Sequence, residues 1–288
     1  MKKLLFLLFS IYTGATASAV SPAQIRWHDE TSDTTAVQAI LERASKTDAR
    51  EPQDYVSAIG REFLGKPYVA HTLEGETEML TVNLDELDCT TYVETVLALA
   101  KTAGEHRKSW RDFIYNLETI RYRGGTMKDY GSRLHYISDW IIDNGHRGNV
   151  QEVSNRAPRN DYVVKTLDFM SAHRDAYPAL KDSAQYARII DVERGYRSHR
   201  FPYIKTNQLQ GRDIQSWLRE GDVVCLTTKT KGLDVSHLGI LTKGEDGEWH
   251  LMHASSSAGK VIVDPLPFYE YLRRSKTLTG FRVLRLKD

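Results

Sequence analysis

The order of apolar and polar positions divides the chain into a helical first part and a β-rich last part. Before about residue 220, apolar residues recur at the three- and four-residue spacing of helices that bury one face. This pattern predicts helices over residues 34–46, 53–64, 89–101, 109–122, 134–144, 160–172 and 182–190. A short strand is expected at 79–83 and loop and strand at 196–209, whereas residues 20–33 carry no strong pattern and are interpreted as a leader.

From Gly221 onward, short runs rich in β-branched and aromatic residues replace the helical pattern. Four such runs, separated by loops that contain Gly or Asp, are typical of an antiparallel meander. We expect these strands at 221–228, 235–242, 249–254 and 261–264, followed by a helix at 268–274 and a last strand at 277–286. Helices first and strands last predict the α+β fold class. No repeat or linker interrupts residues 20–288, which we expect to form a single domain with an insertion at about 105–220.

The first 19 residues have the features of a cleavable export signal. Lys2 and Lys3 precede a short apolar run over residues 4–11, and Ala17-Ser-Ala19 fits a small-residue cleavage site. The apolar run is too short to span a bilayer as a permanent anchor. We expect cleavage after Ala19 and an exported protein, periplasmic in a cell with two membranes.

The composition is that of an ordinary globular protein, with 41% hydrophobic and 27% charged residues in a chain of 288. A net charge of +1 provides no overall field that would favour nucleic acid or an anionic membrane. We therefore expect no nucleic-acid partner and no stable membrane anchor. We also expect a monomer that uses no cofactor and no metal.

Cys89 stands at the start of the helix predicted over residues 89–101. Asp88 is a suitable N-cap, because its carboxylate can accept the free N–H groups of the first turn. The positive end of a helix favours thiolate over thiol, and the thiolate is the nucleophile. Cys89 is therefore a candidate catalytic nucleophile, although a lone cysteine in this position is more often a small buried residue.

Cys225 is the only other cysteine of the chain. Exported proteins commonly join cysteines as disulfides, so a Cys89–Cys225 bridge is a real alternative. Against it, Cys225 lies within an apolar, strand-like run, where a core residue is expected.

Two histidines on neighbouring predicted strands could supply the base that a cysteine nucleophile needs. Adjacent strands lie only ~5 Å apart, so side chains on them can form hydrogen bonds. The predicted arrangement has Cys89 at a helix start, His237 facing it from the sheet, and His253 behind His237. Gly239 beside His237 permits a close approach of another chain segment. A zinc hydrolase with these three residues as metal ligands is an alternative of different chemistry.

Five short motifs occur in a fixed order along the chain. They are Leu64-Gly-Lys-Pro-Tyr68-Val, Leu87-Asp-Cys-Thr90, Gly221-Asp-Val-Val, Ser236-His-Leu-Gly-Ile and Met252-His-Ala-Ser-Ser, within roughly residues 55–103 and 220–286. In this order they resemble the NlpC-type bacterial cell-wall peptidases, which are papain-like cysteine hydrolases. The resemblance implies a papain-like core with Cys89 as nucleophile, His237 as general base and His253 as the orienting third residue. It also implies that Tyr68 lines the site beside the nucleophile. Asp88 and Ser236 are further candidate substrate-binding residues.

The chain departs from that family in two places. Thr90-Thr91 stands where a small Ser-Gly pair is usual, which leaves the pocket for a free peptide N-terminus open to question. The interval from Cys89 to His237 is also longer, and a long insertion beside a site often carries specificity. Within it, residues 130–140 are dense in polar and aromatic groups and are a candidate sugar-facing wall, with substrate-binding residues Arg133, His135, Tyr136 and Trp140. The alternative is an amphipathic helix that buries Leu134, Ile137 and Ile141.

The insertion, the segment around Arg133 and the export signal together resemble the N-acetylmuramoyl-L-alanine amidase-like branch of Gram-negative bacteria. This resemblance implies a cysteine amidase that cuts between the muramyl lactyl group and L-alanine of soluble anhydro-muropeptides, in cell-wall degradation or recycling. The nearest alternative is a D-γ-glutamyl-diamino-acid endopeptidase, which cuts the stem peptide. A catalytically silent muropeptide-binding protein is a third class.

Overall fold

The computed structural model describes residues 20–287, so the export signal predicted for residues 1–19 lies outside the described part of the chain. The first half of the chain forms the helices α1 (Glu30–Ala44), α2 (Pro52–Arg61), α3 (Cys89–Gly104), α4 (Trp110–Arg121) and α5 (Ile137–His146). Each lies where the apolar spacing predicts a helix. Side-chain caps explain two of the starts: Asp29 accepts the N–H of Ser32 in α1, and Ser109 accepts that of Arg111 in α4.

Helix α5 begins three residues later than the predicted range of 134–144. The cause is a tertiary contact, because the N–H of Leu134 donates to the carbonyl of Arg121 and keeps this segment extended. Arg133 forms an isolated antiparallel bridge with Tyr122 at the same place.

The last third of the chain forms the expected meander. The strands β6 (Val223–Thr228), β7 (Val235–Lys243), β8 (Trp249–Ser255) and β9 (Lys260–Pro267) pair in sequence, each antiparallel to the next. Helix α9 (Phe268–Arg274) follows over the predicted residues. Strand β10 (Leu278–Leu286) then crosses back to pair with β6, so that Arg282 lies opposite Cys225. The prediction of an α+β chain with an antiparallel sheet is thus confirmed.

The insertion adds strands to this same sheet. Strands β4 (Asp161–Val164) and β5 (Arg200–Lys205) extend it in the order β4-β5-β10-β6-β7-β8-β9, and β3 (Val150–Glu152) also pairs with β10. The helix predicted at 160–172 is therefore wrong over its first half, because β4 pairs with the distant strand β5. Only the short helix α6 (Phe169–Ala172) remains there. Helix α7 (Ser183–Gly195) is capped by Asp182, and helix α8 (Arg212–Trp217) was not predicted.

The interpretation of residues 20–33 as a leader is wrong for most of that segment. Strand β1 (Ile25–Trp27) pairs in parallel with β2 (Leu80–Val82), and Trp27 packs edge-on against Trp110 with ring centres 5.6 Å apart. Short 3-10 turns connect the other elements at Pro22–Gln24, Arg123–Gly125, Tyr130–Ser132, Ser154–Arg156, Arg174–Ala176, Pro178–Lys181 and Thr206–Gln208.

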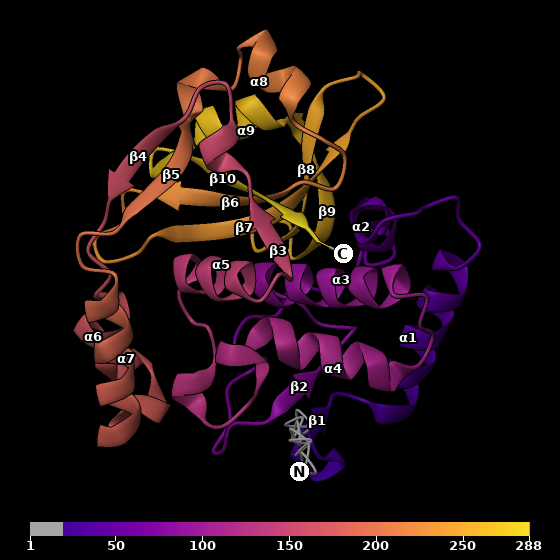
Figure 1. Ribbon diagram of the computed structural model, residues 1–288, viewed down its shortest axis with the longest axis vertical. Coiled ribbons are helices and arrows are strands. Elements are labelled where there is room, and N and C mark those ends of the chain that lie inside the picture. Colours follow the sequence, from indigo (N-terminus) through magenta and orange to yellow (C-terminus); the bar gives the residue numbers. More distant parts are fainter. Residues whose placement is uncertain (1–19, 288) are drawn as a thin grey trace, which may run out of the picture.

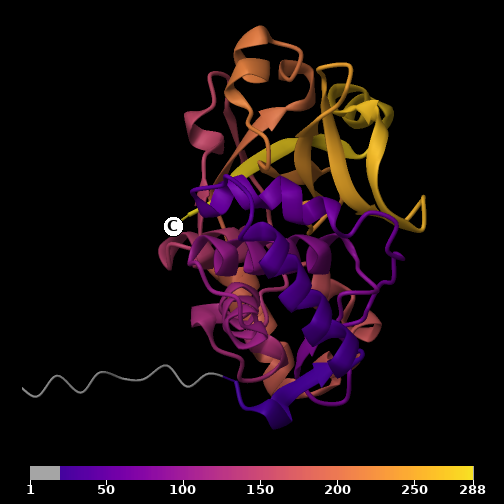
Figure 2. The same ribbon diagram turned by 90° about the vertical axis from the view of Figure 1, so that its right-hand side faces the viewer.

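Helices cover both faces of the sheet (Figure 1). Helices α2 and α3 lie against one face, where Leu97 belongs to the same buried cluster as Met252 of β8. Helix α9 covers the other face, where its Phe268 stacks edge-on against Phe281 of β10. Figure 2 shows the strands and the helical half as two stacked parts of the molecule. Among residues 20–287, no helix is long and apolar enough to cross a membrane.

Candidate active site

Asp88 fixes the start of α3 and therefore the position of Cys89. Its Oδ1 accepts the backbone N–H groups of Thr90 (2.9 Å) and Thr91 (2.8 Å), while Thr91 Oγ1 accepts the N–H of Asp88 (2.9 Å). This is a reciprocal capping box. It leaves Cys89 in the first turn, with its sulfur facing the backbone N–H of Leu238 on β7.

The pKa of the Cys89 thiol is raised, although its position at the start of a helix was expected to favour the thiolate. Burial is the largest influence and, together with the Asp88 carboxylate, it raises the pKa of Cys89 to about 11. The N–H groups of Leu238 and Cys89 itself lower the pKa, but they do not outweigh burial. The expected preference for thiolate is therefore wrong for the resting protein, which holds a neutral thiol and needs a base.

A pair of histidines lies on the neighbouring strands β7 and β8. In the register of β7 and β8, Ile240 is opposite Met252, which places His237 and His253 diagonally on one face. His237 Nε2 and His253 Nδ1 are 2.6 Å apart, a short hydrogen-bond distance. Because this bond engages Nε2, only Nδ1 of His237 remains to receive a proton from elsewhere. Leu238, the next residue of β7, is the one that faces the Cys89 sulfur.

Both histidines are held neutral. Burial lowers the pKa of His237, and the neighbouring His253 lowers it further. Burial also lowers the pKa of His253. A neutral imidazole has a free lone pair, so the resting pair is ready to accept a proton rather than to donate one.

Of the other predicted site residues, Tyr68 and Asp88 lie near Cys89, and Ser236 lies beside His237. Burial raises the pKa of Tyr68, and the neighbouring Cys89 and Asp88 raise it further. Ser236 is exposed and lines a cavity of about 500 Å³ together with His237 and His253. We call this cavity the histidine cleft.

Two residues of the histidine cleft were missed by the sequence reasoning. Tyr271 of α9 stacks edge-on against His253, with ring centres 5.5 Å apart. Asp264 of β9 places its Oδ2 3.6 Å from His253 Nε2. In the sequence, Asp264 is set apart only by its position at the end of the apolar run 261–264. A polar residue there, on the strand next to that of His253, could have been considered as a partner of that histidine.

The four residues of the candidate sugar-facing wall do not line the histidine cleft. Tyr136 is 2% exposed, and its hydroxyl donates to Glu193 at 2.7 Å. Trp140 is 1% exposed, and its Nε1 donates to Glu94 at 3.2 Å. These two side chains belong to the core, because their polar atoms are bonded within it. The amphipathic-helix alternative describes them better.

Arg133 and His135 are also engaged inside the protein. Arg133 is 5% exposed, donates to Glu74 at 2.8 Å and lies over the ring of Tyr130. His135 Nε2 is 2.8 Å from the carbonyl of Tyr130. Burial lowers the pKa of His135 to about 3, and the nearby Arg133 acts in the same direction. Both residues therefore stabilise the fold of the insertion in this conformation.

Neither a disulfide nor a cluster of metal ligands lies at the site. Cys89 and Cys225 are both free thiols, and Cys225 is buried in β6. Within residues 20–287, no group of three His, Cys, Asp or Glu side chains is placed to hold a metal ion.

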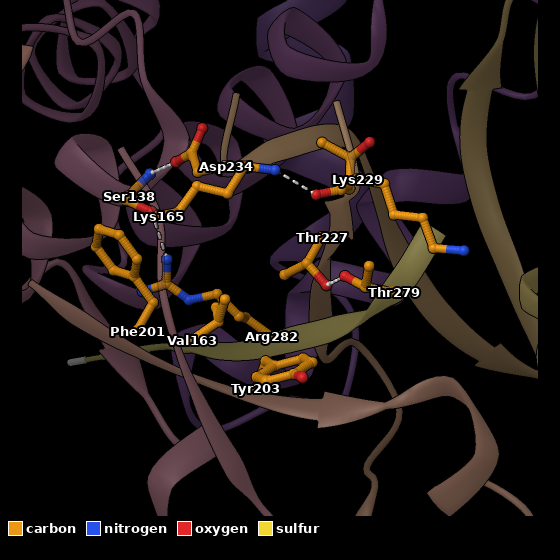
Figure 3. A pocket seen from close by; sticks show the side chains of 11 residues that line it. Ser138, Val163, Lys165, Phe201, Tyr203, Thr227, Lys229, Asp234, Thr279 and Arg282 are labelled. Carbon is orange, nitrogen blue, oxygen red and sulfur yellow. Dashed lines mark hydrogen bonds between the residues drawn. The ribbon is translucent and has the colours of Figure 1, made fainter. Parts of the chain in front are cut away.

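Figure 3 shows a separate, smaller cavity of about 280 Å³ between the insertion strands and the central sheet. Its polar groups bond mainly to one another. Thr227 and Thr279 share a 2.7 Å hydrogen bond, and Lys165 donates to the carbonyl of Thr228 at 2.5 Å. Phe201 and Tyr203 add aromatic walls, so this cavity presents mostly apolar surface and none of the predicted catalytic residues.

The chain is similar to known amidase-like proteins. A model of the N-acetylmuramoyl-L-alanine amidase-like (AmiA-like) family matches residues 58–279. A crystal structure of an N-acetylmuramoyl-L-alanine amidase from Bacteroides uniformis is 38% identical, with a TM-score of 0.76, and the match covers 82% of this chain and 99% of that one.

Two further solved structures share the fold. A Bacteroides fragilis protein, provisionally named a xylanase, is 40% identical over 80% of this chain and 100% of its own, with a TM-score of 0.74. A Legionella pneumophila protein of the DUF1460 family is 22% identical over 90% of this chain and 96% of its own, with a TM-score of 0.67, and supports the fold alone. No curated protein matches this chain.

Proposed function

Because this chain belongs to the N-acetylmuramoyl-L-alanine amidase-like family, we propose that it is a cysteine amidase that hydrolyses the bond between the N-acetylmuramoyl group and L-alanine. Its substrates would be soluble anhydro-muropeptides met during cell-wall degradation or recycling, after export directed by residues 1–19. One observation carries the proposal: His237 is hydrogen-bonded to His253 at 2.6 Å and directly precedes Leu238, which faces the sulfur of Cys89. The same geometry supports a papain-like core of the NlpC type.

The proposed reaction is an acyl transfer through a thioester. His237 takes the proton of Cys89, and the thiolate attacks the amide carbonyl between the lactyl group and L-alanine. The backbone N–H of Cys89, at the positive end of α3, helps to stabilise the oxyanion. His237 then gives its proton to the leaving amine of L-alanine. Water, activated by His237, hydrolyses the thioester and regenerates the thiol.

His253 orients the base in this scheme. For Nδ1 of His237 to accept a proton, its Nε2 must carry the other one and donate it to His253. The 2.6 Å distance permits this bond, and the burial of His253 keeps its ring in place. Tyr68 and Asp88, which both influence the electrostatics around Cys89, are the proposed substrate contacts beside it.

Incubation with a defined anhydro-disaccharide tetrapeptide, followed by mass spectrometry, tests the proposal. Release of free anhydro-disaccharide and intact tetrapeptide supports the amidase. A cut within the stem, between D-glutamate and the diamino acid, would assign the endopeptidase activity instead. Binding without any product, measured by calorimetry, would identify a silent binding protein.

A xylan-cleaving activity has less support from the site. Most glycosidases place two carboxyl groups on either side of the scissile bond. The histidine cleft is lined by one carboxylate, Asp264, and two neutral histidines. The same incubation with xylan oligosaccharides is therefore expected to give no product.

A further inference from the structure

A second cavity of about 510 Å³ adjoins the histidine cleft, because Ser275 and Leu278 line both. Three cationic side chains, Lys205, Lys229 and Arg273, line this second cavity, and no carboxylate does. We call it the basic chamber. It lies beyond the histidine cleft, between β5, β10 and the C-terminal end of α9.

Two of the three cations have no compensating charge in the described part of the chain. Lys205 forms an ion pair with Asp161. Lys229 donates instead to a neutral acceptor, the carbonyl of Lys276, at 3.2 Å. No acidic side chain described here pairs with Arg273. Uncompensated positive charge in a concave site attracts anions.

Neutral hydrogen-bonding groups complete the basic chamber. The side chains of Asn207, Gln210 and Thr206 line it. The two amide groups can donate hydrogen bonds to an anion held beside the three cations.

From these observations, and resting on the proposed function, we propose that the basic chamber binds carboxylates of the stem peptide while the scissile amide lies at Cys89. The leaving group of the proposed reaction is a peptide that carries a carboxylate on its second residue. Two extended residues span about 7 Å, which is the reach of this peptide from the scissile amide to that carboxylate. Arginine binds a carboxylate through two parallel hydrogen bonds, and lysine supplies a point charge beside it.

Binding measurements test this proposal independently of catalytic turnover. The protein with Cys89→Ala is titrated with the stem dipeptide L-alanyl-D-glutamate, whose γ-carboxyl is blocked as an amide as in the stem, and with the analogue in which the α-carboxyl is a carboxamide as well. We expect the carboxylate form to bind three- to tenfold more tightly. Lys229→Gln and Arg273→Gln should each reduce that preference to less than twofold, whereas Lys231→Gln should retain it, since Lys231 is exposed on the same loop but does not line the chamber.

Equal affinity for the two dipeptides, or no binding of either, would overturn the basic chamber as a carboxylate site. A preference that persists in both Lys229→Gln and Arg273→Gln would do the same. Failure of the proposed function has a different signature. The wild-type protein would then leave the anhydro-muropeptide uncut, although the carboxylate preference of the Cys89→Ala protein remained.

An independent observation concerns the far side of the histidine pair. His253 Nε2 is buried and has no hydrogen-bond partner among the residues described, yet it faces Asp264 Oδ2 at 3.6 Å. That distance is too long for a hydrogen bond, but a carboxylate so close favours a proton on the facing nitrogen. The other oxygen, Oδ1, accepts the N–H of Leu266 at 2.9 Å and holds the carboxylate in place.

We infer that Asp264 is a positioning residue that sets the tautomer of both histidines. A proton on His253 Nε2 leaves His253 Nδ1 as an acceptor for the N–H of His237 Nε2. His237 Nδ1 then keeps the lone pair that takes the proton of Cys89. The opposite tautomer of His253 would place a proton on His237 Nδ1 and block it as a base.

Asp264→Asn tests this second inference, which also rests on the proposed function. Its amide oxygen can keep the bond to Leu266, so that the NH₂ group donates to His253 Nε2 and reverses both tautomers. We expect kcat to fall 10- to 1,000-fold with KM within threefold, and ¹⁵N NMR of labelled histidines to show protonation of His237 Nδ1. Asp264→Glu should restore at least part of kcat. Asp246→Asn is the matched control, since the Asp246 carboxylate contacts a different histidine of β8, His250, at 3.1 Å.

An unchanged His237 tautomer in Asp264→Asn would overturn the inference, whatever the activity. A purely structural role for Asp264 would lower the yield of folded protein without inverting the tautomer. If the wild-type protein proves inactive on muropeptides, the NMR measurement still decides whether Asp264 sets the protonation of the pair.

Discussion

His237 and His253 share one hydrogen bond, 2.6 Å long, between Nε2 of the first and Nδ1 of the second. The bond is diagonal across two antiparallel strands, so the register of β7 and β8 decides it. A shift of one residue would turn one ring to the opposite face of the sheet. The pair therefore depends on the whole meander, and its two members have unequal roles in the proposed reaction.

The first prediction concerns the two cysteines. Cys89→Ala should abolish amide hydrolysis, because the sulfur that attacks the amide carbonyl is lost. Cys225→Ala should keep activity within a few-fold of wild type and lower the free energy of unfolding by about 1–2 kcal/mol, since a small buried side chain is shortened. Product analysis and denaturant titration of both variants measure these effects. Activity in Cys89→Ala within a few-fold of wild type would refute the proposed mechanism.

The second prediction separates the two histidines. His237→Gln should reduce kcat by at least about 1,000-fold, because the base itself is lost. His253→Gln should reduce kcat by only about 10- to 100-fold, because the glutamine carbonyl can still accept the N–H of His237. Single-turnover assays on an anhydro-muropeptide measure both losses. Equal losses would contradict the distinct roles.

The third prediction decides between the two interpretations of Trp140. If Trp140 is a core residue bonded to Glu94, Trp140→Ala should lower the free energy of unfolding by about 3–5 kcal/mol. The KM of the folded fraction should then change little. A sugar-binding residue would instead raise KM at nearly constant stability. Tyr162→Ala is a suitable control, because Tyr162 is 43% exposed and should change stability by less than about 0.5 kcal/mol.

The fourth prediction concerns Gly239, two residues after His237. A Cβ atom here would lie 2.5 Å from Leu251 Cδ1 and 3.0 Å from the carbonyl oxygen of Met252. Gly239→Ala should therefore destabilise the protein by about 1–3 kcal/mol, by forcing β7 and β8 apart. Gly195→Ala, where a Cβ atom meets nothing within 4 Å, is the control and should be close to neutral. Thermal unfolding of both variants gives the comparison.

The fifth prediction is a pH dependence of stability. Burial lowers the pKa of His135 in the folded protein to about 3 from its ordinary value of 6.5. Between these values the unfolded chain binds a proton that the folded chain does not, so stability falls as the pH falls below about 6.5. His237 and His253, with pKa values of about 3 and about 4, act in the same direction.

Replacement of His135 isolates one of these contributions. His135→Gln keeps an N–H group for the carbonyl of Tyr130 but cannot take up the proton. The slope of unfolding free energy against pH, between pH 6 and 4, should fall by up to about 1.4 kcal/mol per pH unit. Denaturant titrations at several pH values measure it. An unchanged slope would show that His135 is not neutral in the folded protein.

The local features of this fold could be predicted from the sequence because their causes are local. The start of α3 follows from the Asp88 cap, whose hydrogen-bond partners lie two and three residues away. The meander β6 to β9 and the helix α9 follow from alternating apolar runs separated by short turns. The fold class and the candidates Cys89, His237 and His253 could therefore be named before any contact was known.

The remaining features depend on partners far away in the chain, which no local pattern contains. Residues 161–164 form a strand only because β5 lies beside them, and residues 25–27 only because of β2. Burial, and not the end of the helix, decides the pKa of Cys89, because desolvation depends on everything packed around the sulfur. The sequence by itself determined which side chains can do the chemistry. Tertiary packing decided that Trp140 is buried in the core and that Asp264 lies behind His253, since burial and proximity arise only when distant segments meet.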